Sequence, residues 1–366
     1  MARTGIASFP GVLKTNPYQR LLYEHLAAHG YHVVEGSRFD FGRLWRARRS
    51  VTVLHFHWPQ SYWHHEHGPA RLRRPLSYVK VGLLAARLAL ARALGYRIAW
   101  TVHQVYPHEV ADPRLERVGS RTLAAMSHVL IAHDASTREV ARRELGRAAR
   151  KVAIVPHGSY VGVYPPGRPR DAVRAELGLG DGPAFLAFGN LRAYKDTSFL
   201  LGAFAATGLD ASLVVAGPVG DDGVADDVRA VAAADPRVKP VLGYMPDDAV
   251  AEHFGAADVA VVTRNDGGTS GAVILALSLG LPVVAPRRPA YAELLDGEAA
   301  GWLFEPGDAA GLQAALERAG AEGEAGRRAK GEAARARADA LNWSDIAART
   351  AALFRGRTEG RSGPQT

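Results

Sequence analysis

The sequence contains no cysteine among its 366 residues. This absence excludes a disulfide scaffold, a thiolate nucleophile and a cysteine metal site. It fits a cytoplasmic protein, which is the location that we expect, with the inner face of the membrane as the alternative.

Long apolar runs are also missing. The N-terminus has no apolar core of signal-peptide length, so export is not expected. The most apolar stretch, residues 79–98, is interrupted by Lys80, Arg87, Arg92 and Arg97, so we expect no bilayer-spanning helix.

The composition that is present is ordinary for a globular protein. Hydrophobic residues make up 47% of the chain and charged residues 22%, which excludes a disordered or fibrous protein. Because 366 residues exceed what one hydrophobic core usually serves, we expect two domains.

Charge is divided unevenly along the chain. Residues 1–165 hold 24 Lys and Arg against 10 Asp and Glu, a net charge of +14, whereas the rest of the chain carries −6. Thirteen of the fourteen histidines also precede residue 158. The basic half predicts an anionic partner: nucleic acid, a membrane face or a phosphorylated substrate.

Short apolar runs alternate with amphipathic helical patterns in both halves, which is typical of parallel βα units and predicts two tandem doubly wound α/β domains. The breaker-rich segment 164–169 lies between them. The expected strands are residues 4–8, 51–57, 97–103, 128–133, 152–156, 184–188, 212–216, 238–242, 259–263, 282–285 and 302–304. The expected helices are residues 17–29, 76–94, 113–126, 135–144, 197–206, 222–234, 247–254, 271–279, 291–295 and 309–319.

Two loops that follow expected strands of the second half carry anion-binding residues. After residues 184–188 come Gly189 and Asn190, then Arg192 and Lys195, a pair of cations suited to a diphosphate. A plain solvated basic loop is the alternative.

The second loop follows residues 259–263 and precedes a helix. We expect Gly268, Thr269, Ser270 and Gly271 to meet a phosphate there, because backbone N–H groups and the helix dipole attract anions. Asp266 on the same loop is also expected to bind the donor. A glycine turn with an ordinary helix cap is the alternative.

Several stretches of the second half resemble the donor domain of the GT-B glycosyltransferases, nearest the large retaining family numbered four (group 1). The matching residues are 188–195, Val214-Val215-Ala216-Gly217-Pro218, Ala256-Ala257-Asp258-Val259, Ser278-Leu279-Gly280-Leu281-Pro282-Val283-Val284-Ala285, 301–308, Val155-Pro156-His157-Gly158 and Asn342-Trp343-Ser344-Asp345-Ile346.

The resemblance implies two Rossmann-like domains facing a cleft. Residues 1–160 would bind the acceptor, residues 161–183 would be the linker and residues 184–340 would bind a nucleotide sugar. Residues 341–356 would form a helix that crosses back to the first domain, and residues 357–366 read as a disordered tail. Aligned on Gly280, the family's two glutamates are replaced here by Gly267 and Leu275.

On this resemblance the chain is expected to move a sugar from a UDP- or GDP-sugar to a hydroxyl of a saccharide, lipid-linked or natural-product acceptor. Retention of configuration, no metal and no cofactor are implied. Arg192 and Lys195 would stabilise the leaving diphosphate. Alternatives are a noncatalytic nucleotide-sugar-binding relative and a sugar-nucleotide epimerase of the same fold.

Loops of the first half supply the remaining candidates. Gly11 is expected at the donor, and Lys14 and Asn16 at the acceptor. His57 and Trp58 follow another strand and are expected at the acceptor as well, since sugars stack on aromatic rings.

His103 ends a central strand, and Glu109 follows it on the same loop. We expect both to be catalytic, either one serving as the base if the enzyme inverts, and His103 also to touch the acceptor. The run His64-His65-Glu66-His67 has poor spacing for one metal, so acceptor contacts are favoured over a metal site.

The segment 71–75 and the helix after it are basic and apolar, which allows peripheral contact with an anionic membrane. A helix buried in the sandwich, with solvated arginines at its ends, is the alternative. No nucleic-acid-binding module is recognised, so nucleic acid is not an expected partner.

Overall fold

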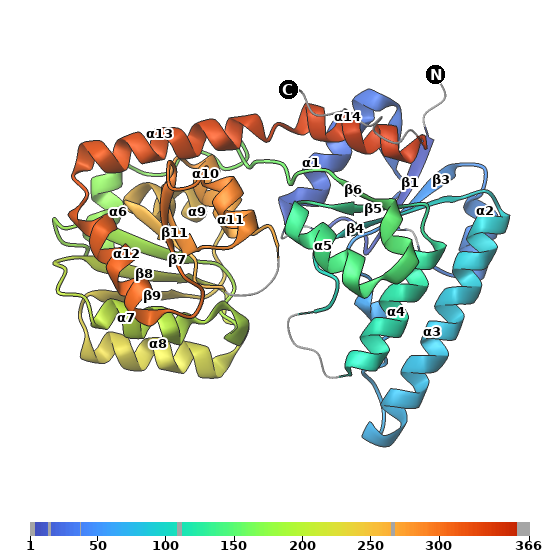
Figure 1. The fold of residues 1–366 in the computed structure, drawn as a ribbon, viewed down its shortest axis with the longest axis horizontal. Coiled ribbons are helices and arrows are strands. Elements are labelled where there is room, and N and C mark those ends of the chain that lie inside the picture. The colour runs from blue at the N-terminus through green and yellow to red at the C-terminus, as the bar shows by residue number, and fades with distance from the viewer. Residues whose placement is uncertain (1–3, 14–15, 37, 108–111, 265–267, 357–366) are drawn as a thin grey trace. The chain divides into compact units, whose positions relative to one another are not determined.

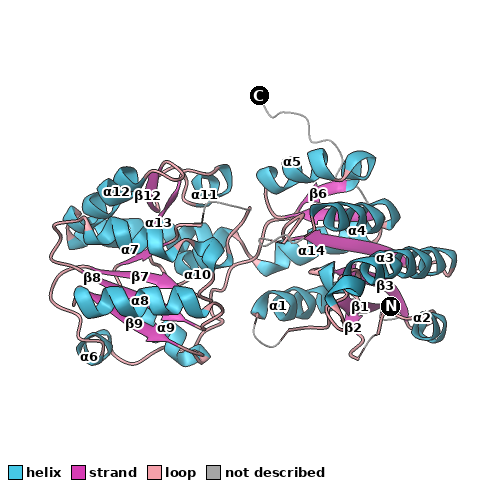
Figure 2. Ribbon diagram, turned by 90° about the horizontal axis from the view of Figure 1, so that it is seen from below, coloured by secondary structure: helices cyan, strands magenta, loops and turns pink. Residues whose placement is uncertain are grey.

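A computed structural model describes the chain except for residues 1–3, 14–15, 37, 108–111, 265–267 and 357–366. The chain forms two compact units, residues 1–158 with 343–366, and residues 159–342 (Figure 1). Each unit is a six-stranded parallel sheet with helices on both faces (Figure 2). No helix in the described part of the chain combines the length and apolar character needed to cross a membrane.

The first sheet has the strand order β2-β1-β3-β4-β5-β6. The chain leaves β1 toward β2 and then continues on the other side of β1 from β3 onward, so the order reverses between β1 and β3. Ligands of doubly wound folds bind beyond the carboxyl ends of the strands at such a point. The strands are β1 (Thr4–Phe9), β2 (Tyr31–Val33), β3 (Val51–Phe56), β4 (Arg97–Val102), β5 (Val129–Ala132) and β6 (Val152–Ile154).

Buried aliphatic and aromatic side chains join the helices of the first unit to its sheet, with Trp63, Trp100 and Phe56 among the largest. The helices are α1 (Pro17–Leu26), α2 (Phe41–Ala47), α3 (Ala70–Ala93), α4 (Pro113–Met126) and α5 (Ala135–Glu144), with short 3₁₀ helices η1 (Ala27–His29), η2 (Pro59–Tyr62) and η3 (Gly146–Lys151).

Helix α3 begins six residues earlier than expected. We placed its start after Pro75, but Pro75 lies inside the helix. Pro75 is the sixth residue of α3, past the first turn, so its missing N–H removes one intrahelical hydrogen bond, and the helix continues on both sides of it.

The second sheet has the order β12-β11-β10-β7-β8-β9, and its order reverses between β7 and β10. The strands are β7 (Ala184–Phe188), β8 (Ser212–Gly217), β9 (Val238–Leu242), β10 (Val259–Val261), β11 (Val283–Pro286) and β12 (Gly301–Phe304). The helices are α6 (Arg170–Glu176), which lies in the segment expected as a linker, η4 (Ala193–Lys195), α7 (Thr197–Ala205), α8 (Asp222–Ala234), α9 (Asp247–Ala256), α10 (Gly271–Ser278), α11 (Pro289–Leu294), α12 (Ala309–Ala321) and α13 (Glu324–Ala340).

The last helix, α14 (Trp343–Phe354), returns to the first unit and packs against α1. Arg97 Nε donates to the Leu353 carbonyl over 3.1 Å. A Cβ atom at Gly158 would lie 2.3 Å from Trp343 Cε2, so only glycine lets the indole pack this closely. The helix is therefore part of the first core.

Candidate functional site

The loop after β7 carries the predicted cations and is fixed by its neighbours. Leu191 N donates to the Pro218 carbonyl over 2.8 Å, and Gly220 N donates to the Leu191 carbonyl over 3.0 Å. Thr263, just after β10, donates its hydroxyl to the Lys195 carbonyl over 2.7 Å. The ends of β7, β8 and β10 therefore hold this loop. The order of the sheet reverses between β7 and β10.

Glycines make the space that Lys195 occupies. Gly189 has a φ of +116°, and a Cβ atom there would lie 2.6 Å from Lys195 Nζ. Gly217 has a φ of +140°, and its Cβ would lie 2.5 Å from the Gly189 carbonyl oxygen. The backbone turns sharply and admits the lysine because neither position carries a side chain.

Both cations are available to a ligand. Within the described part of the chain, neither the Lys195 ammonium nor the exposed Arg192 guanidinium has a hydrogen bond or ion pair. Burial lowers the pKa of Lys195 to about 8, and the nearby charge of Arg264 contributes to this shift. A partly desolvated cation of this kind gains more than an exposed one from an anionic ligand.

The start of α10 lies on the next loop. Ser270 caps it by accepting a hydrogen bond from Val273 N over 3.5 Å, so its hydroxyl serves the ordinary capping role. Gly268 is buried and Thr269 half-buried, while Asp266 lies outside the described residues. A Cβ at Gly271 would lie 3.5 Å from the Tyr160 hydroxyl, so the helix start is close to an aromatic side chain of the same unit.

The structure thus brings some of the predicted donor-binding residues together. Asn190, Arg192 and Lys195 share the loop after β7, and a Cβ at Gly220 would lie 2.6 Å from Asn190 Oδ1 and 3.0 Å from Arg192 Nε. Gly11 belongs to the first unit and lies on its surface. Sequence reasoning gave no role to Gly220, to Gly217 or to Thr263.

The carboxyl edge of the first sheet carries a polar side chain on each of five neighbouring strands. Ser8 is the second-last residue of β1, and four histidines follow the other strands in spatial order. They are His57 after β3, His103 after β4, His133 after β5 and His157 after β6. This row is the candidate site of the first unit.

Hydrogen bonds link part of this row into a chain. Tyr23 Oη of α1 lies 2.8 Å from His57 Nε2 and 3.0 Å from His55 Nδ1. His55 Nε2 lies 2.8 Å from Thr101 Oγ1, and His57 Nδ1 lies 3.2 Å from His103 Nε2. A continuous path therefore runs from Thr101 through Tyr23 to His103.

Burial keeps these histidines neutral. It lowers the pKa of His55 and of His157 to about 3, and the neighbouring imidazoles add to the effect. It also lowers the pKa of His57 and His103 well below the usual value, and that of His133. Without charge, the row suits hydroxyl groups better than phosphates.

An aromatic platform adjoins His103. Trp58 stacks on its imidazole with ring centroids 4.3 Å apart and an interplanar angle of 10°. Tyr18 of α1 meets His103 edge-on at 5.0 Å and also touches His57, His133 and His157. The structure thus brings together His57, Trp58 and His103, which the sequence analysis proposed at the acceptor.

The other candidate residues of the first half are not part of this row. Asn16 caps α1, since its Oδ1 accepts a hydrogen bond from Tyr18 N over 3.0 Å. Lys14 and Glu109 lie outside the described residues. Sequence reasoning did not predict that Tyr23 and His55 bond to this row. The concentration of histidines before residue 158 was a signal that it could have used.

The histidine run after Trp63 is tied into the fold. His64 Nε2 and Trp63 Nε1 both bond the carboxylate of Glu116, which is 1% exposed. In the described segments, no group of three or more His, Asp or Glu side chains has the arrangement of a metal site.

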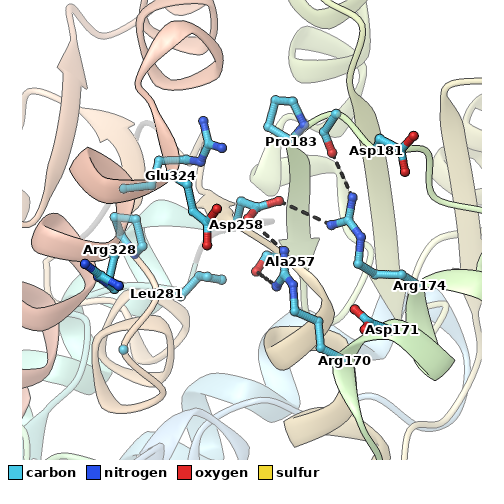
Figure 3. A pocket seen from close by; sticks show the side chains of 14 residues that line it. Arg170, Asp171, Arg174, Asp181, Pro183, Ala257, Asp258, Leu281, Glu324 and Arg328 are labelled. Carbon is cyan, nitrogen blue, oxygen red and sulfur yellow. Dashed lines mark hydrogen bonds and ion pairs between the residues drawn. The ribbon is translucent and has the colours of Figure 1, made fainter.

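A cavity of about 490 Å³ opens at the amino ends of β7, β10 and β11 (Figure 3). Its arginines are occupied: Arg170 and Arg174 reach Asp258 at 2.8 and 3.3 Å. Asp258 also accepts a hydrogen bond from Ala184 N over 2.8 Å. This cluster braces α6 against the sheet, at the edge opposite the loop of Arg192.

Comparison with known proteins identifies the second unit. Residues 182–321 match the family model described as Glycosyl transferases group 1. The chain is also 27% identical over 291 residues to a GDP-mannose:glycolipid 4-beta-D-mannosyltransferase of Xanthomonas campestris pv. campestris, an alignment that covers 79% of this chain and 75% of that protein.

Solved structures share the fold of both units. Sucrose-phosphate synthase from Thermosynechococcus elongatus superposes with a TM-score of 0.73 at 21% identity, covering 97% of this chain and 99% of that one. HepE from Anabaena, solved in complex with UDP, gives a TM-score of 0.72 at 14% identity, covering 97% and 100%.

Proposed function

Since the chain is a GT-B-type glycosyltransferase that carries a glycosyl transferases group 1 domain at residues 182–321, we propose that it moves a hexose from a UDP- or GDP-sugar to a hydroxyl of a saccharide, glycolipid or natural-product acceptor. The relative from Xanthomonas is named for GDP-mannose and a glycolipid, and HepE was solved with UDP. These names support a nucleoside diphosphate sugar as the donor.

The observation that carries the proposal is the loop of Arg192 and Lys195. Two cations that have no partner among the described residues lie beyond the carboxyl edge of the sheet, where its strand order reverses. Gly189 keeps that place open for the Lys195 ammonium. A diphosphate matches this arrangement in charge, and an arginine fork adds directed hydrogen bonds.

The chemistry follows from the position of the charge. As the bond between the sugar and the diphosphate breaks, negative charge grows on the leaving phosphate, and Arg192 and Lys195 would stabilise it. The sugar carbon would pass through an oxocarbenium-like state. Protein cations can supply this stabilisation, so we propose transfer without a metal or cofactor.

The acceptor is proposed to bind at the first unit. Trp58 offers a flat face beside His103, and the neutral imidazoles offer hydrogen bonds to hydroxyl groups. We propose retention of configuration. The Xanthomonas relative is named for a β-linkage. The anomer of the product is therefore the measurement that distinguishes retention from inversion in this chain.

Thermal-shift and transfer assays test the proposal. The wild type is incubated with UDP, GDP, ADP and their sugars, beside Arg192→Ala and Lys195→Ala. One nucleotide series should raise the melting temperature of the wild type, and either variant should reduce the shift, because each loses about 1.5–3 kcal/mol of charged hydrogen bonding. Arg229→Ala is the matched control, since Arg229 is an exposed arginine that pairs with Asp226 in another part of the unit.

The products separate the alternatives. Transfer to an added acceptor supports the transferase. Release of an epimerised nucleotide sugar without acceptor identifies an epimerase, and nucleotide binding without any turnover identifies a binding protein. Failure of every nucleotide sugar to bind would overturn the proposed donor site.

We also propose peripheral contact with an anionic membrane through α3. Leu72, Leu76, Val79 and Leu83 form one stripe along this helix, each between 38 and 58% exposed. Residues 67–107 contain seven Lys and Arg and no Asp or Glu. An apolar stripe in a wholly basic segment suits a surface of anionic lipid, where a glycolipid acceptor would be found.

A further inference from the structure

The first unit contains a cavity of about 720 Å³ between the loop after β3 and the first turns of α3 and α4. These two helices pack against each other (Figure 1). Pockets that bind small molecules have volumes of about 300–1,000 Å³. The cavity is therefore large enough for a whole head group and not only for a single ion.

Hydrogen bonds hold the loop that forms one wall of the cavity. Ser77 Oγ of α3 accepts a hydrogen bond from His65 N over 2.9 Å, and Lys80 Nζ donates to the His64 carbonyl. The imidazole of His64 also bonds the carboxylate of Glu116 in α4. Because the loop is tied to both helices, a ligand would meet a wall that is already ordered.

Most charged groups around the cavity are balanced by a neighbour. The balanced pairs are Arg74 with Asp112 at 2.8 Å, His64 with Glu116, and Glu66 with the ammonium of Lys80. These pairs carry little net charge, so they do not decide what the cavity attracts.

Two arginines of the cavity have no acidic partner among the described residues, Arg73 of α3 and Arg114 of α4. Arg73 Nε donates to the Gly68 carbonyl over 3.1 Å, which leaves its terminal N–H groups to a ligand. Both residues are exposed. Arginine binds phosphate oxygens with paired hydrogen bonds, so the cavity favours a phosphate or diphosphate over a neutral sugar.

Helix α3 presents an apolar surface beside the cavity. Arg73, Ser77 and Lys80 are spaced to share one face of the helix, and this face meets the cavity and its loop wall. The apolar stripe that begins at Leu72 and includes Leu76 is displaced from this face by one residue along the helix. A ligand with its phosphate in the cavity can therefore lay an apolar chain along α3.

We propose that this cavity binds the phosphate or diphosphate head group of a lipid whose chain lies on the apolar stripe of α3. Arg73 and Arg114 hold the phosphate oxygens. The identification of this lipid as the glycolipid acceptor rests on the proposed function, whereas the binding of a lipid phosphate does not.

The loop after β3 connects this cavity to the row of histidines. His64 follows Trp58 by six residues, so their Cα atoms are at most about 20 Å apart. A glycolipid anchored by its phosphate in the cavity can extend a short saccharide toward Trp58 and His103. The anchor thus selects acceptors by their lipid phosphate and not by their sugars alone.

Calorimetric titration with geranyl diphosphate, inorganic diphosphate and geraniol tests the proposal. The full chain carries Arg192→Ala and Lys195→Ala in every titration, so that the donor loop does not bind the diphosphate. Geranyl diphosphate should bind at least about tenfold more tightly than inorganic diphosphate, because its chain adds apolar burial. It should exceed geraniol by at least about tenfold as well, because the phosphates add charged hydrogen bonds.

Single substitutions locate the site. Arg73→Ala and Arg114→Ala should each weaken the binding of geranyl diphosphate about tenfold, through loss of a charged hydrogen bond. Leu76→Ser should weaken the binding of geranyl diphosphate and leave that of inorganic diphosphate unchanged. Arg71→Ala is the matched control, since Arg71 is an exposed arginine of the same helix that does not line the cavity.

Three results would overturn the proposal. Equal affinity for geranyl diphosphate and inorganic diphosphate would assign the phosphate to a soluble ligand. Equal affinity for geranyl diphosphate and geraniol would show that the phosphate is not recognised. Binding that neither Arg73→Ala nor Arg114→Ala weakens would place the ligand elsewhere.

Transfer kinetics add a second readout. With a glycolipid acceptor that carries a diphosphate, Arg73→Ala should raise KM for the acceptor about tenfold and leave kcat unchanged. With the same oligosaccharide lacking the lipid diphosphate, Arg73→Ala should behave as the wild type does. An unchanged KM for the glycolipid would contradict its identification as the acceptor. An inactive wild type would contradict the proposed function, but not the titrations, which use a chain without the cations of the donor loop.

Discussion

Lys195 is the residue whose protonation should govern donor binding. Its pKa of about 8 means that the ammonium is charged below pH 8 and loses its proton above it. A bound diphosphate favours the charged form, so affinity should fall as the pH rises above about 8, by up to about tenfold per pH unit. Calorimetric titration of the nucleotide between pH 6.5 and 9.5 measures this. Lys195→Arg should remove the dependence, because arginine stays charged; an unchanged slope in that variant would assign the effect to another group.

Gly189 should be intolerant of any side chain. Alanine there would place Cβ 2.6 Å from Lys195 Nζ at a φ of +116°. We expect Gly189→Ala to lose the thermal shift given by the nucleotide and to cost about 1–3 kcal/mol of stability. The control is Gly202→Ala in α7, where a Cβ would meet no atom within 4 Å and stability should be unchanged or higher by up to about 1 kcal/mol. Normal nucleotide binding by Gly189→Ala would show that the ammonium does not need this space.

Sequence reasoning at the residue scale predicted the positions of residues in the loops that follow strands, while the roles proposed for them stay predictions. Arg192, Lys195, His57 and His103 lie at the carboxyl edges of the sheets, as parallel topology requires. It could not find Tyr23, which comes from a helix face and joins the row only through tertiary packing. Helical periodicity indicates which residues are buried but not which polar groups they meet.

Helix α3 is the element that should decide membrane binding. Replacing Leu76 and Val79 together by Glu introduces two negative charges into the apolar stripe. Binding to vesicles that contain phosphatidylglycerol should weaken at least about tenfold, through loss of both apolar burial and charge attraction. Co-sedimentation measures it, with Tyr244→Glu as the control, since Tyr244 is 79% exposed in the second unit. Co-sedimentation of the double variant equal to that of the wild type would contradict lipid binding by α3. A wild-type dimer that the double variant breaks would also contradict it, because the stripe would then bind a second copy of the chain.

Some helices and strands were not predicted from the sequence pattern. The strands of both sheets were predicted except β2, whose three residues are too short to show alternation. Helix α13 was also missed, because its sequence is rich in Ala, Arg and Glu and only Gly331, Ala334 and Ala338 are buried. Such a helix shows little apolar periodicity, since small residues mark its packed face.

For the whole molecule, length and composition predicted two domains, but they could not show how the chain divides. The return of α14 to the first unit depends on Trp343 packing against Gly158, a contact between residues 185 positions apart. Only the resemblance to a family indicated that crossing. Long-range contacts of this kind leave no periodic trace in a sequence.

The two units should also respond differently to acid. Five histidines of the first unit have pKa values lowered by burial: the buried His55, His57, His133 and His157, and the half-buried His103. Below pH 6.5 the unfolded chain binds protons that the folded unit does not, so stability is complete above that pH and is lost as the pH falls toward 3. Each histidine contributes up to about 1.4 kcal/mol per pH unit.

The second unit contains a single histidine, so it provides an internal control for this effect. Hydrogen exchange at pH 7 and pH 5.5, corrected for intrinsic rates, should show protection falling in β4 and β5 while β7 and β8 keep theirs. Equal losses in both sheets would assign the acid sensitivity to groups outside the histidine row. Loss confined to the first sheet would show that the row which presents His103 is held at a cost in acid stability, and that the cost falls on one unit of the molecule.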